Sequence, residues 1–362
     1  MNTQQNKNLK NFSGVKVLIT GTTGFKGSWL ALWLKKLGAK VYGASLKPDA
    51  SSILFKSLKL SNKINQEYLD IKNFSKIDNF IKKNRPDIVF HLAAQSTVLE
   101  GYKDPLNTFN TNIIGSANVM ESVRKNKIPN LVYVTSDKCY SVLKKKKSYN
   151  EFDRLGGDDN YSASKASAEI IFNSFYKSYF QSKILKYASV RAGNVIGGGD
   201  FKVDRIVPDI MRSLYLEKKL ILRNPSYIRP WQHVLDPLAG YLILGERLLN
   251  NKLRGNIHPS WNFGPEKNNC KNVLNLSRCI LKISKKVKKI NFKNSNKNFR
   301  ESSFLSINSN KARKELNWRP TLNFNQSINL TVAWYKNFYQ KNKLGNNYNF
   351  TMNQIEKFEN YN

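Results

Sequence analysis

The fold is decided by the stretch Val15-Lys16-Val17-Leu18-Ile19-Thr20-Gly21-Thr22-Thr23-Gly24-Phe25-Lys26-Gly27. Its first part is rich in β-branched residues and predicts a short strand over Val15–Thr20. Three glycines follow, and from Phe25 to Leu37 the apolar residues recur at helical spacing. The stretch therefore predicts a strand, a glycine-rich turn and a helix in direct succession.

Each glycine has a use in that arrangement. Gly21 permits a tight turn, Gly24 lets the backbone approach a pyrophosphate at the helix N-terminus, and Gly27 lets the helix pack closely on the strand. The same spacing also occurs by chance in ordinary turns, so the flanking strand and helix are what make it informative. We expect a dinucleotide to lie against Gly21, Thr23, Gly24, Phe25, Lys26 and Gly27.

Strands and helices alternate over the rest of the first half. Further strands are predicted at Lys40–Ser45, Gln66–Ile71, Asp87–Ala93, Leu131–Ser136 and Leu185–Arg191, and helices at Phe74–Lys83, Pro105–Lys125 and Tyr161–Phe180. This alternation predicts an α/β fold of the Rossmann type, with a doubly wound and mostly parallel sheet.

The rhythm changes after about residue 195. Helices are predicted at Ile206–Glu217, Pro237–Leu249, Val273–Ser284, Lys311–Leu316 and Phe324–Tyr339. We expect a dinucleotide-binding domain over residues 1–195 and a smaller C-terminal α/β substrate lobe over residues 196–340. The two are interleaved, because a segment near residues 233–264, including Trp261–Phe263, is expected to return to the sheet. Residues 341–362 are rich in Asn and Lys and are predicted to be a frayed tail.

The formal net charge is +35, from 60 Lys and Arg against 25 Asp and Glu. Such a charge is typical of a nucleic-acid or anionic-membrane partner, but also of a compositional drift toward Lys and Asn. The lysines are spread along the chain, with one dense run at Lys144–Lys147 that we expect in a solvated loop. We therefore favour drift and expect no specific nucleic-acid partner, although the charge favours an anionic substrate.

Composition also argues against several other classes of protein. No apolar run approaches the roughly 18 residues that cross a bilayer, and the start of the chain is polar, so we expect a cytoplasmic protein without a membrane span. Cys139, Cys270 and Cys279 lack metal-binding spacing, and the chain has 3 His. Neither a disulfide framework nor a metal site is expected.

The ends of the next strands bear on the choice of dinucleotide. The second strand ends in Ser45-Leu46-Lys47 rather than in the acid that usually holds the adenosine ribose, and Asp49 comes slightly late. Lys47 suits a 2′-phosphate, so local chemistry leaves NAD and NADP both open. We expect the cofactor also to contact Asp70, Ile71, Leu92, Ala93 and Ala94.

Tyr161 and Lys165 are four positions apart at the start of a predicted helix, so they share one face. A nearby ammonium favours the phenolate of a tyrosine and lets it act as a base. The preceding strand ends in Ser136-Asp137-Lys138, where the Ser136 hydroxyl can hydrogen-bond a reacting oxygen. Asp137 and Lys138 form an acid/base couple, or alternatively an ordinary surface turn.

These motifs resemble those of the extended short-chain dehydrogenase/reductases, and among them the CDP-glucose 4,6-dehydratases, over about Lys16 to Tyr339. The general motifs are Thr20–Gly27, His91–Gln95, Tyr161–Lys165 and Arg191–Asn194. The more specific ones are Gly24–Leu30, Thr135–Tyr140, Arg191–Asp200 and Arg229–Val234. The dTDP- and GDP-sugar relatives carry Asp-Glu where this chain has Asp137-Lys138.

The resemblance implies an NAD-dependent lyase that converts CDP-D-glucose to CDP-4-dehydro-6-deoxy-D-glucose and water, in deoxysugar and lipopolysaccharide O-antigen synthesis. It implies that Tyr161 takes the proton of the sugar 4-hydroxyl, Ser136 holds that oxygen, and Lys165 tunes Tyr161 and holds the nicotinamide ribose. Asp137 is then the acid that protonates the departing 6-hydroxyl, and Lys138 the base that acts at carbon 5.

The same resemblance points to residues that face the substrate. They are Gln95, Ser96, Asn194, Asp204, Arg205, Arg229 and Gln232. An arginine fork suits a diphosphate. Trp231 or Tyr227 either stacks on the base or packs in the core, and both alternatives stay open. Relatives pair through long helices such as Pro105–Lys125 and Tyr161–Phe180, which implies a homo-oligomer, either a dimer or a tetramer.

Two other functions fit parts of the sequence. A nucleotide-sugar 4-epimerase or reductase on the same scaffold needs Tyr161 and Lys165, but it does not need Asp137 and Lys138. A catalytically silent nucleic-acid-binding protein would use the positive charge, but the intact set of Ser136, Tyr161 and Lys165 argues against it.

Overall fold

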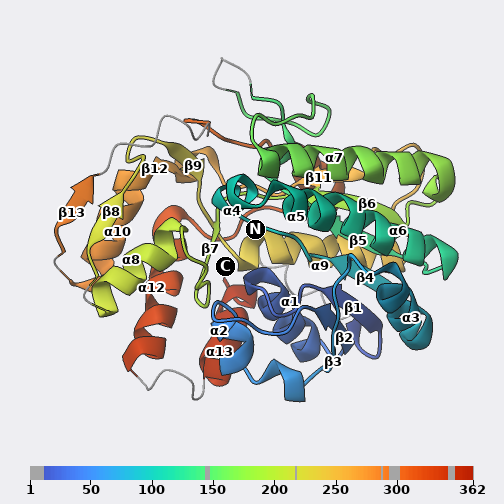
Figure 1. Cartoon of the computed structure of the whole chain (residues 1–362), viewed down its shortest axis with the longest axis horizontal. Coiled ribbons are helices and arrows are strands. Elements are labelled where there is room, and N and C mark those ends of the chain that lie inside the picture. Colours follow the sequence, from blue (N-terminus) through green and yellow to red (C-terminus); the bar gives the residue numbers. More distant parts are fainter. Residues whose placement is uncertain are drawn as a thin grey trace.

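The computed structural model describes residues 12–142, 147–216, 218–286, 288–292, 302–340 and 347–361. Seven strands form one sheet in which every neighbouring pair is parallel (Figure 1). Their order across the sheet is β11 (Ser260–Asn262), β6 (Tyr187–Arg191), β5 (Leu131–Val134), β4 (Ile88–His91), β1 (Lys16–Thr20), β2 (Lys40–Ser45) and β3 (Asn65–Tyr68). The predicted doubly wound parallel sheet is confirmed.

The sheet edge beyond β6 is completed from the second half of the chain. Trp261 of β11 lies opposite Val190 of β6, so the expected return of Trp261–Phe263 to the sheet is confirmed. At the middle of the sheet the strand order reverses between β1 and β4, because the chain runs outward from both of these strands in opposite directions. A crevice opens at such a switch point, at the carboxyl ends of the strands.

Helices cover both faces of the sheet (Figure 1). One face carries α1 (Phe25–Lys36) and α9 (Leu235–Leu249), and the other carries α3 (Phe74–Asn84), α6 (Gly115–Lys125) and α7 (Asn160–Phe175). The short helices α2 (Ile53–Ser57), α4 (Val98–Lys103) and α5 (Pro105–Phe109) lie in the connections between them.

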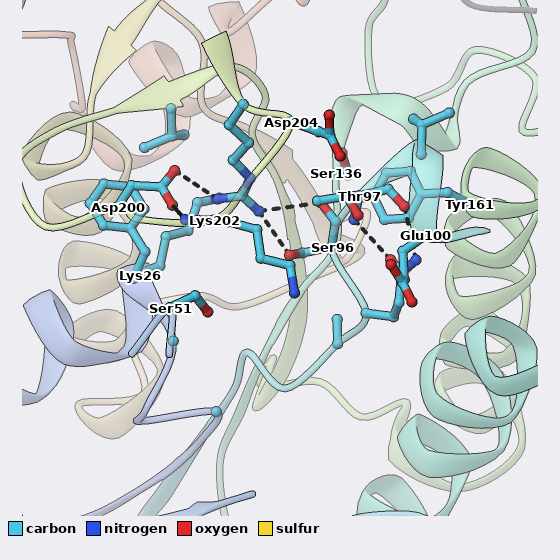
Figure 2. Close-up of a pocket in the computed structure, with 18 of the residues that line it drawn as sticks. Lys26, Ser51, Ser96, Thr97, Glu100, Ser136, Tyr161, Asp200, Lys202 and Asp204 are labelled. Carbon is cyan, nitrogen blue, oxygen red and sulfur yellow. Dashed lines mark hydrogen bonds and ion pairs between the residues drawn. The ribbon is translucent and has the colours of Figure 1, made fainter. Parts of the chain in front are cut away.

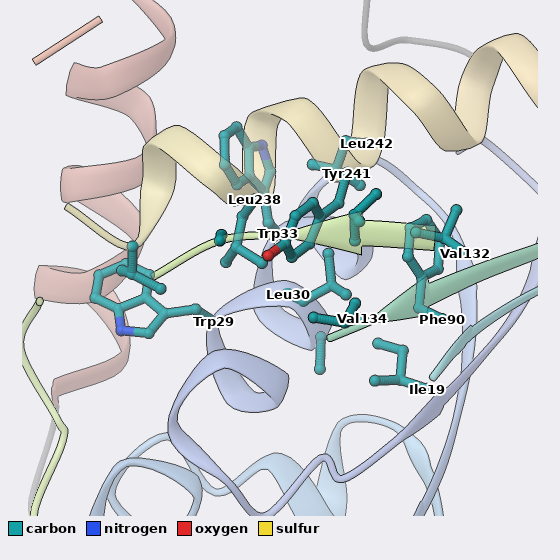
Figure 3. Close-up of a cluster of buried hydrophobic side chains, with 14 of the residues drawn as sticks. Ile19, Trp29, Leu30, Trp33, Phe90, Val132, Val134, Leu238, Tyr241 and Leu242 are labelled. Atoms are coloured by element: carbon teal, nitrogen blue, oxygen red, sulfur yellow. The ribbon is translucent and has the colours of Figure 1, made fainter. Parts of the chain in front are cut away.

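Helix α1 is buried on all sides rather than on one stripe. Figure 3 shows Trp29, Leu30 and Trp33 of this helix packed between the sheet and α9. The surrounding side chains are Ile19, Phe90, Val132 and Val134 from the strands and Leu238, Tyr241 and Leu242 from α9. Since the N-terminus of α1 follows the glycine turn directly, this packing fixes the position of that turn.

The predicted helix Pro105–Lys125 differs in its middle. Between α5 and α6 the backbone forms a wider π-helical turn at Asn110–Ile114. Within this turn Asn112 donates from Nδ2 to the Gln95 carbonyl (3.1 Å) and to Ser164 Oγ (2.9 Å), and it accepts from the Gln95 N–H (2.8 Å). A similar turn, Tyr176–Phe180, ends the helix that starts with α7. The first turn therefore ties the segment after β4 to α7, and π-turns are frequent at functional sites.

The C-terminal lobe lies beside the carboxyl ends of the strands (Figure 1). Its helices are α8 (Ile206–Tyr215), α10 (Val273–Ser284), α11 (Asn310–Leu316) and α12 (Phe324–Gln340). Its short strands pair as β7 (Val195–Ile196) with β10 (Gln232–His233), β9 (Ile228–Pro230) with β12 (Cys270–Asn272), and β8 (Leu220–Leu222) with β13 (Ile290–Phe292).

The prediction of a frayed tail is wrong for most of its length. Residues Asn347–Glu359 form helix α13, which packs against α1. Glu359 accepts a hydrogen bond from Trp33 Nε1 (2.8 Å) and forms an ion pair with Lys36 (2.8 Å), while the buried ring of Phe358 lies edge-on to Trp33. The polar composition misled the prediction, because few but regularly spaced apolar residues suffice when a tryptophan surface is available to cover.

Two further expectations concern the surface. Within the described ranges no helix is long and apolar enough to cross a membrane. The lysine run at Lys144–Lys147 lies outside the described residues except for Lys147, which forms an ion pair with Asp153.

Candidate functional site

A cavity of about 890 Å³ opens where the sheet meets the C-terminal lobe. It is lined by the residues that follow the carboxyl ends of β1 to β6 and by residues of the lobe. Of the residues expected at the site, the following line it: Gly21, Thr23, Gly24, Phe25, Lys26, Gly27, Asp70, Ile71, Leu92, Ala93, Ala94, Gln95, Ser96, Ser136, Asp137, Lys138, Tyr161, Lys165, Asn194, Asp204, Arg205 and Arg229. Gln232 does not.

Close backbone contacts require the glycines of the first turn. Gly21 has φ +81°, and a Cβ there would lie 2.9 Å from the backbone of Ala93. A Cβ on Gly27 would lie 2.1 Å from the carbonyl oxygen of Gly21. Gly24 is the N-cap residue of helix α1, so no side chain caps the helix, and its first turn contains no acid. Its first N–H groups and its dipole therefore suit a phosphate group that enters the cavity.

The far end of the cavity is lined by residues after β2 and β3. The Asp49 carboxylate accepts hydrogen bonds from Ser51 and Ser52 of its own loop, including Ser51 Oγ at 2.8 Å and Ser52 Oγ at 2.9 Å. Asp70 accepts from the Lys72 N–H (2.9 Å). The Asp49 carboxylate is thus already hydrogen-bonded within its own loop. Lys47, which suits a 2′-phosphate, also lines the cavity.

Ser136 and Tyr161 come from two neighbouring elements of the sheet and its helical layer. Ser136 follows β5, and its hydroxyl accepts from the Lys138 N–H (3.2 Å) and donates to Asp137 Oδ1 (3.1 Å). Tyr161 lies in the first turn of α7, which Asp159 caps by accepting from the Ser162 N–H (2.9 Å). Burial raises the pKa of Tyr161 to about 12, although the Ser136 hydroxyl and the charge of Arg205 oppose the shift.

Two lysines of the site have unusually low proton affinity. Burial, together with the charge of Lys26, lowers the pKa of Lys165 to about 8. Burial and the charge of Arg205 likewise lower the pKa of Lys26 to about 8. Lys26 therefore lies in the glycine turn, but its charge interacts with Lys165 and so affects the Tyr161–Lys165 cluster. From the sequence, Lys26 was expected only to contact the cofactor.

Asp137 is buried, with 2% of its surface exposed, so the alternative of a surface turn is wrong for this residue. Its Oδ2 has no hydrogen-bond partner among the described residues. That oxygen occupies the space beside Gly193, where an added Cβ would lie 1.7 Å from it. Burial raises the pKa of Asp137, against the charges of Lys138 and Arg229 and the hydrogen bond from Ser136. The group is thus disposed to hold a proton.

On the lobe side Arg205 bridges two parts of the cavity, because it bonds to both Asp200 and Ser96, which are labelled in Figure 2. Its guanidinium donates to Asp200 Oδ2 (2.9 Å) and to Ser96 Oγ (2.8 Å), so it joins the lobe to the segment after β4. Asp204 forms an ion pair with Arg223 (3.2 Å). Several cations therefore converge on this half of the cavity.

The neighbouring aromatic residues differ in their surroundings. Tyr227 lines the cavity with the guanidinium of Arg229 over its ring, 5.2 Å from the centroid. Trp231 is buried, and its Nε1 donates to the Lys271 carbonyl (2.8 Å). Tyr227 is thus the more accessible surface for a base, and Trp231 mainly packs in the core.

Two glutamines that were expected to contact the substrate instead form hydrogen bonds to the protein backbone. Gln232, expected to contact substrate, is fully buried and donates from Nε2 to the carbonyls of Gly193 (3.0 Å) and Phe263 (2.9 Å), because the β7–β10 pair turns its side chain away from the cavity. Gln95 lines the cavity, but its amide bonds to the Thr97 backbone through both ends (2.8 Å each). Sequence reasoning missed Glu100, Lys202 and Arg223, which also line the cavity, because no motif marks them.

The comparisons with known proteins agree with this geometry. The sequence model of the family described as GDP-mannose 4,6 dehydratase matches residues 18–331. The chain belongs to this family. It is 38% identical to the CDP-glucose 4,6-dehydratase of Salmonella typhimurium over 90% of this chain and 92% of that protein. It is also 23% identical to the UDP-glucose 4-epimerase of Mycoplasma pneumoniae over 90% of this chain and 98% of that protein.

Solved structures share the fold of this GDP-mannose 4,6 dehydratase family member. The dTDP-glucose 4,6-dehydratase of Bacillus anthracis, solved with NAD, has a TM-score of 0.74 and 24% identity, with 89% of this chain and 97% of that one covered. The UDP-glucose 4-epimerase of Thermotoga maritima, solved with UDP-glucose, has a TM-score of 0.78 and 21% identity, with 90% and 99% covered. The sequence-based recognition of the family is confirmed.

The lysine environments can be tested by titration. We expect Lys26 and Lys165 to lose their protons near pH 8, since burial and neighbouring cations disfavour the charged forms. Dimethylation of the lysines with ¹³C-labelled formaldehyde and NMR titration should reveal early-titrating resonances, one of them absent from Lys26→Met and another from Lys165→Met. Lys311, whose pKa burial also lowers to about 8, should give a further one that both variants retain. Titration of every lysine at its ordinary pKa would contradict the cavity electrostatics described here.

Proposed function

We propose that this protein is a nucleotide-sugar 4,6-dehydratase that converts CDP-D-glucose to CDP-4-dehydro-6-deoxy-D-glucose and water. The observation that carries the proposal is a buried Asp137, whose pKa is raised by burial, beside the Ser136–Tyr161–Lys165 set, in a chain that is 38% identical to a CDP-glucose 4,6-dehydratase. We further propose that residues 1–195 bind the dinucleotide and residues 196–340 the sugar nucleotide, the two being interleaved through β11.

The cavity fits NAD as the dinucleotide. The glycine turn leaves no room for side chains, and the uncapped N-terminus of α1 offers N–H groups to a pyrophosphate. The pyrophosphate would be held by the glycine turn, namely Gly21, Thr23, Gly24, Phe25, Lys26 and Gly27. The adenosine would contact Asp70 and Ile71, and the nicotinamide ribose would contact Tyr161 and Lys165. Between them the dinucleotide would lie close to the backbone of Leu92, Ala93 and Ala94. When bound there, NAD would supply hydride acceptance at carbon 4 and hydride donation at carbon 6.

Tyr161 is proposed to take the proton of the 4-hydroxyl while Ser136 holds the same oxygen. Burial raises the pKa of Tyr161 to about 12, so the phenol needs further stabilisation of its phenolate to act as a base. The charged Lys165, the Ser136 hydroxyl and a positive nicotinamide ring all favour the phenolate. We therefore expect these three groups together to make Tyr161 a competent base.

The 4-ketone formed by oxidation acidifies the proton on carbon 5, and elimination then needs a base and an acid. Asp137 is the proposed acid, since burial raises its pKa and so favours the protonated form that the departing 6-hydroxyl needs. Lys138 is the proposed base, and it must act as a neutral amine. Lys26, whose pKa is lowered to about 8 by burial and the charge of Arg205, is the alternative candidate for this base.

The lobe supplies the groups for the sugar nucleotide. Arg205 and Arg229 are proposed to face the diphosphate, and Ser96, Asn194 and Asp204 the sugar-phosphate region. Tyr227 is proposed to stack on the base. Gln95 contributes by shaping the loop after β4, since its amide is bound to Thr97.

A 4-epimerase or reductase on the same scaffold is the alternative. Epimerases share the fold, so the fold does not separate the two reactions. The buried acid Asp137 separates them. An epimerase has no step that needs a protonated carboxyl at carbon 6. A dehydratase does need one, and this need accounts for a carboxyl that is buried at a cost in free energy.

Two further proposals concern the oligomeric state of the protein and its location in the cell. We propose a homo-oligomer, because Leu106, Ile114, Ile170 and Tyr179 are exposed apolar side chains on the neighbouring elements of the α5–α7 layer. Monomers throughout a sedimentation experiment would contradict it. The cytoplasmic location expected from the sequence likewise stays a proposal, which fractionation of cells would test.

The reaction and the nucleotide can be tested together. Incubation with NAD and a panel of CDP-, dTDP-, UDP- and GDP-sugars should give a product one water lighter from CDP-glucose alone, as measured by mass spectrometry. Water loss from another sugar nucleotide would keep the reaction and exclude the CDP substrate. A product of unchanged mass with inverted carbon 4 by NMR would mean an epimerase.

Variants separate the two halves of the reaction. Tyr161→Phe should prevent oxidation at carbon 4, so turnover should fall by about 10²- to 10⁴-fold because general base catalysis is lost. Lys138→Ala should still oxidise the sugar but fail to exchange the carbon 5 hydrogen with solvent deuterium. Normal exchange in Lys138→Ala would exclude Lys138 as the base, and the same loss in Lys26→Met would then assign the role to Lys26.

A further inference from the structure

Helix α7 carries a third polar side chain on the face of Tyr161 and Lys165. Glu169 lies one turn after Lys165 and is fully buried. Its Oε2 accepts from Arg191 Nη2 (2.7 Å) and from Ser189 Oγ (3.0 Å), and its Oε1 accepts from Thr135 Oγ1. None of the proton transfers proposed above uses this carboxylate.

The carboxylate is fixed from behind by a second row of partners. Arg191 also donates from Nη1 to the Tyr140 hydroxyl (2.9 Å) and to the Glu151 carbonyl (3.1 Å). The Tyr140 hydroxyl in turn donates to Asn262 Oδ1 (2.7 Å) on β11. Burial raises the pKa of Glu169, but Arg191 and the hydroxyl donors outweigh it and keep the group ionised. Glu169 is therefore a charged, immobile anchor beneath the site.

The three donors to Glu169 differ in what they carry. Ser189 and Arg191 belong to β6, which bears none of the proposed catalytic residues. Thr135 comes directly before Ser136 and Asp137, and its own N–H is bound to the Val190 carbonyl (2.9 Å). Among the donors that the structure describes, only the Thr135 hydroxyl therefore connects the helix of Tyr161 and Lys165 to the strand end of Ser136 and Asp137 through this carboxylate.

A buried ion pair is a weak way to stabilise a fold, because taking both charges out of water costs about as much as their attraction returns. It is a good way to fix a direction, since a carboxylate with four lone-pair sites accepts only from donors placed around it. The arrangement of Glu169 thus points to geometry rather than to stability.

We propose that Glu169 and Thr135 are positioning residues, and that the hydrogen bond between them sets the spacing of Tyr161 from Ser136 during oxidation at carbon 4. The inference rests on the proposed function. Proton and hydride transfer need reacting atoms held within a fraction of an ångström, so loss of the link should slow the chemical step while binding is retained.

Thr135→Val tests the link, because valine keeps the shape of threonine and removes the hydroxyl. Ser189→Ala is the matched control: it removes another buried hydroxyl from the same carboxylate but leaves the Thr135 link. We expect Thr135→Val to lower the rate of carbon 4 oxidation, followed by the absorbance of reduced cofactor in a single turnover, by about 10- to 100-fold. The KM for the sugar nucleotide should stay near that of the wild type.

Ser189→Ala should lower the melting temperature by a similar amount and leave the oxidation rate near that of the wild type. Thr135→Ser keeps the hydroxyl and should restore most of the rate. Equal losses in Thr135→Val and Ser189→Ala, or a normal rate in Thr135→Val, would overturn the positioning role. If Thr135→Val does not fold, Thr135→Cys carries the comparison, with a reduced rate expected and a wild-type rate as the contradicting result.

The proposed function and the positioning role fail in different ways. If the wild-type chain turns over no sugar nucleotide, the proposed function is wrong and the positioning role fails with it. If the wild type dehydrates its substrate and the two variants behave alike, only the positioning role is wrong.

Discussion

Two close backbone contacts made by the glycine turn are the constraint on which the rest of the site depends. Gly21 lies against the backbone of Ala93 and Gly27 against the carbonyl of Gly21, at distances that leave no room for a Cβ. These contacts bring the N-terminus of α1 to the point where the strand order reverses, and the burial of Trp29 and Trp33 holds it there. A helix N-terminus, a crevice and the ends of β4 and β5 thereby meet in one cavity.

Burial of charge then gives that cavity its chemistry. Lys26 and Lys165 lose proton affinity and Asp137 gains it, all because the site is withdrawn from water. The close approach of Asp137 Oδ2 to Gly193 shows how closely the backbone has been shaped around this acid. A buried carboxyl that favours its protonated form and a lysine that acts as a neutral amine are the pair that elimination of water requires.

Much of this was predictable because local patterns encode it. The spacing of Gly21, Gly24 and Gly27 and the pair Tyr161–Lys165 are local, and the apolar stretch around Trp261 predicted a returning strand. What failed depends on long-range packing: Gln232 sits in the expected motif, yet its side chain points to the carbonyls of Gly193 and Phe263. The helix around Phe358 was missed because its stability comes from Trp33, more than three hundred residues earlier in the chain.

The most direct test of the central claim follows a single hydrogen. CDP-glucose with deuterium at carbon 4 would be incubated with the protein and NAD in ordinary water, and the label located in the product by NMR. The account predicts a 4-keto-6-deoxy sugar with the deuterium at carbon 6, because the hydride never leaves the enclosed site. Deuterium retained at carbon 4 of an epimer, or lost to the solvent, would contradict it.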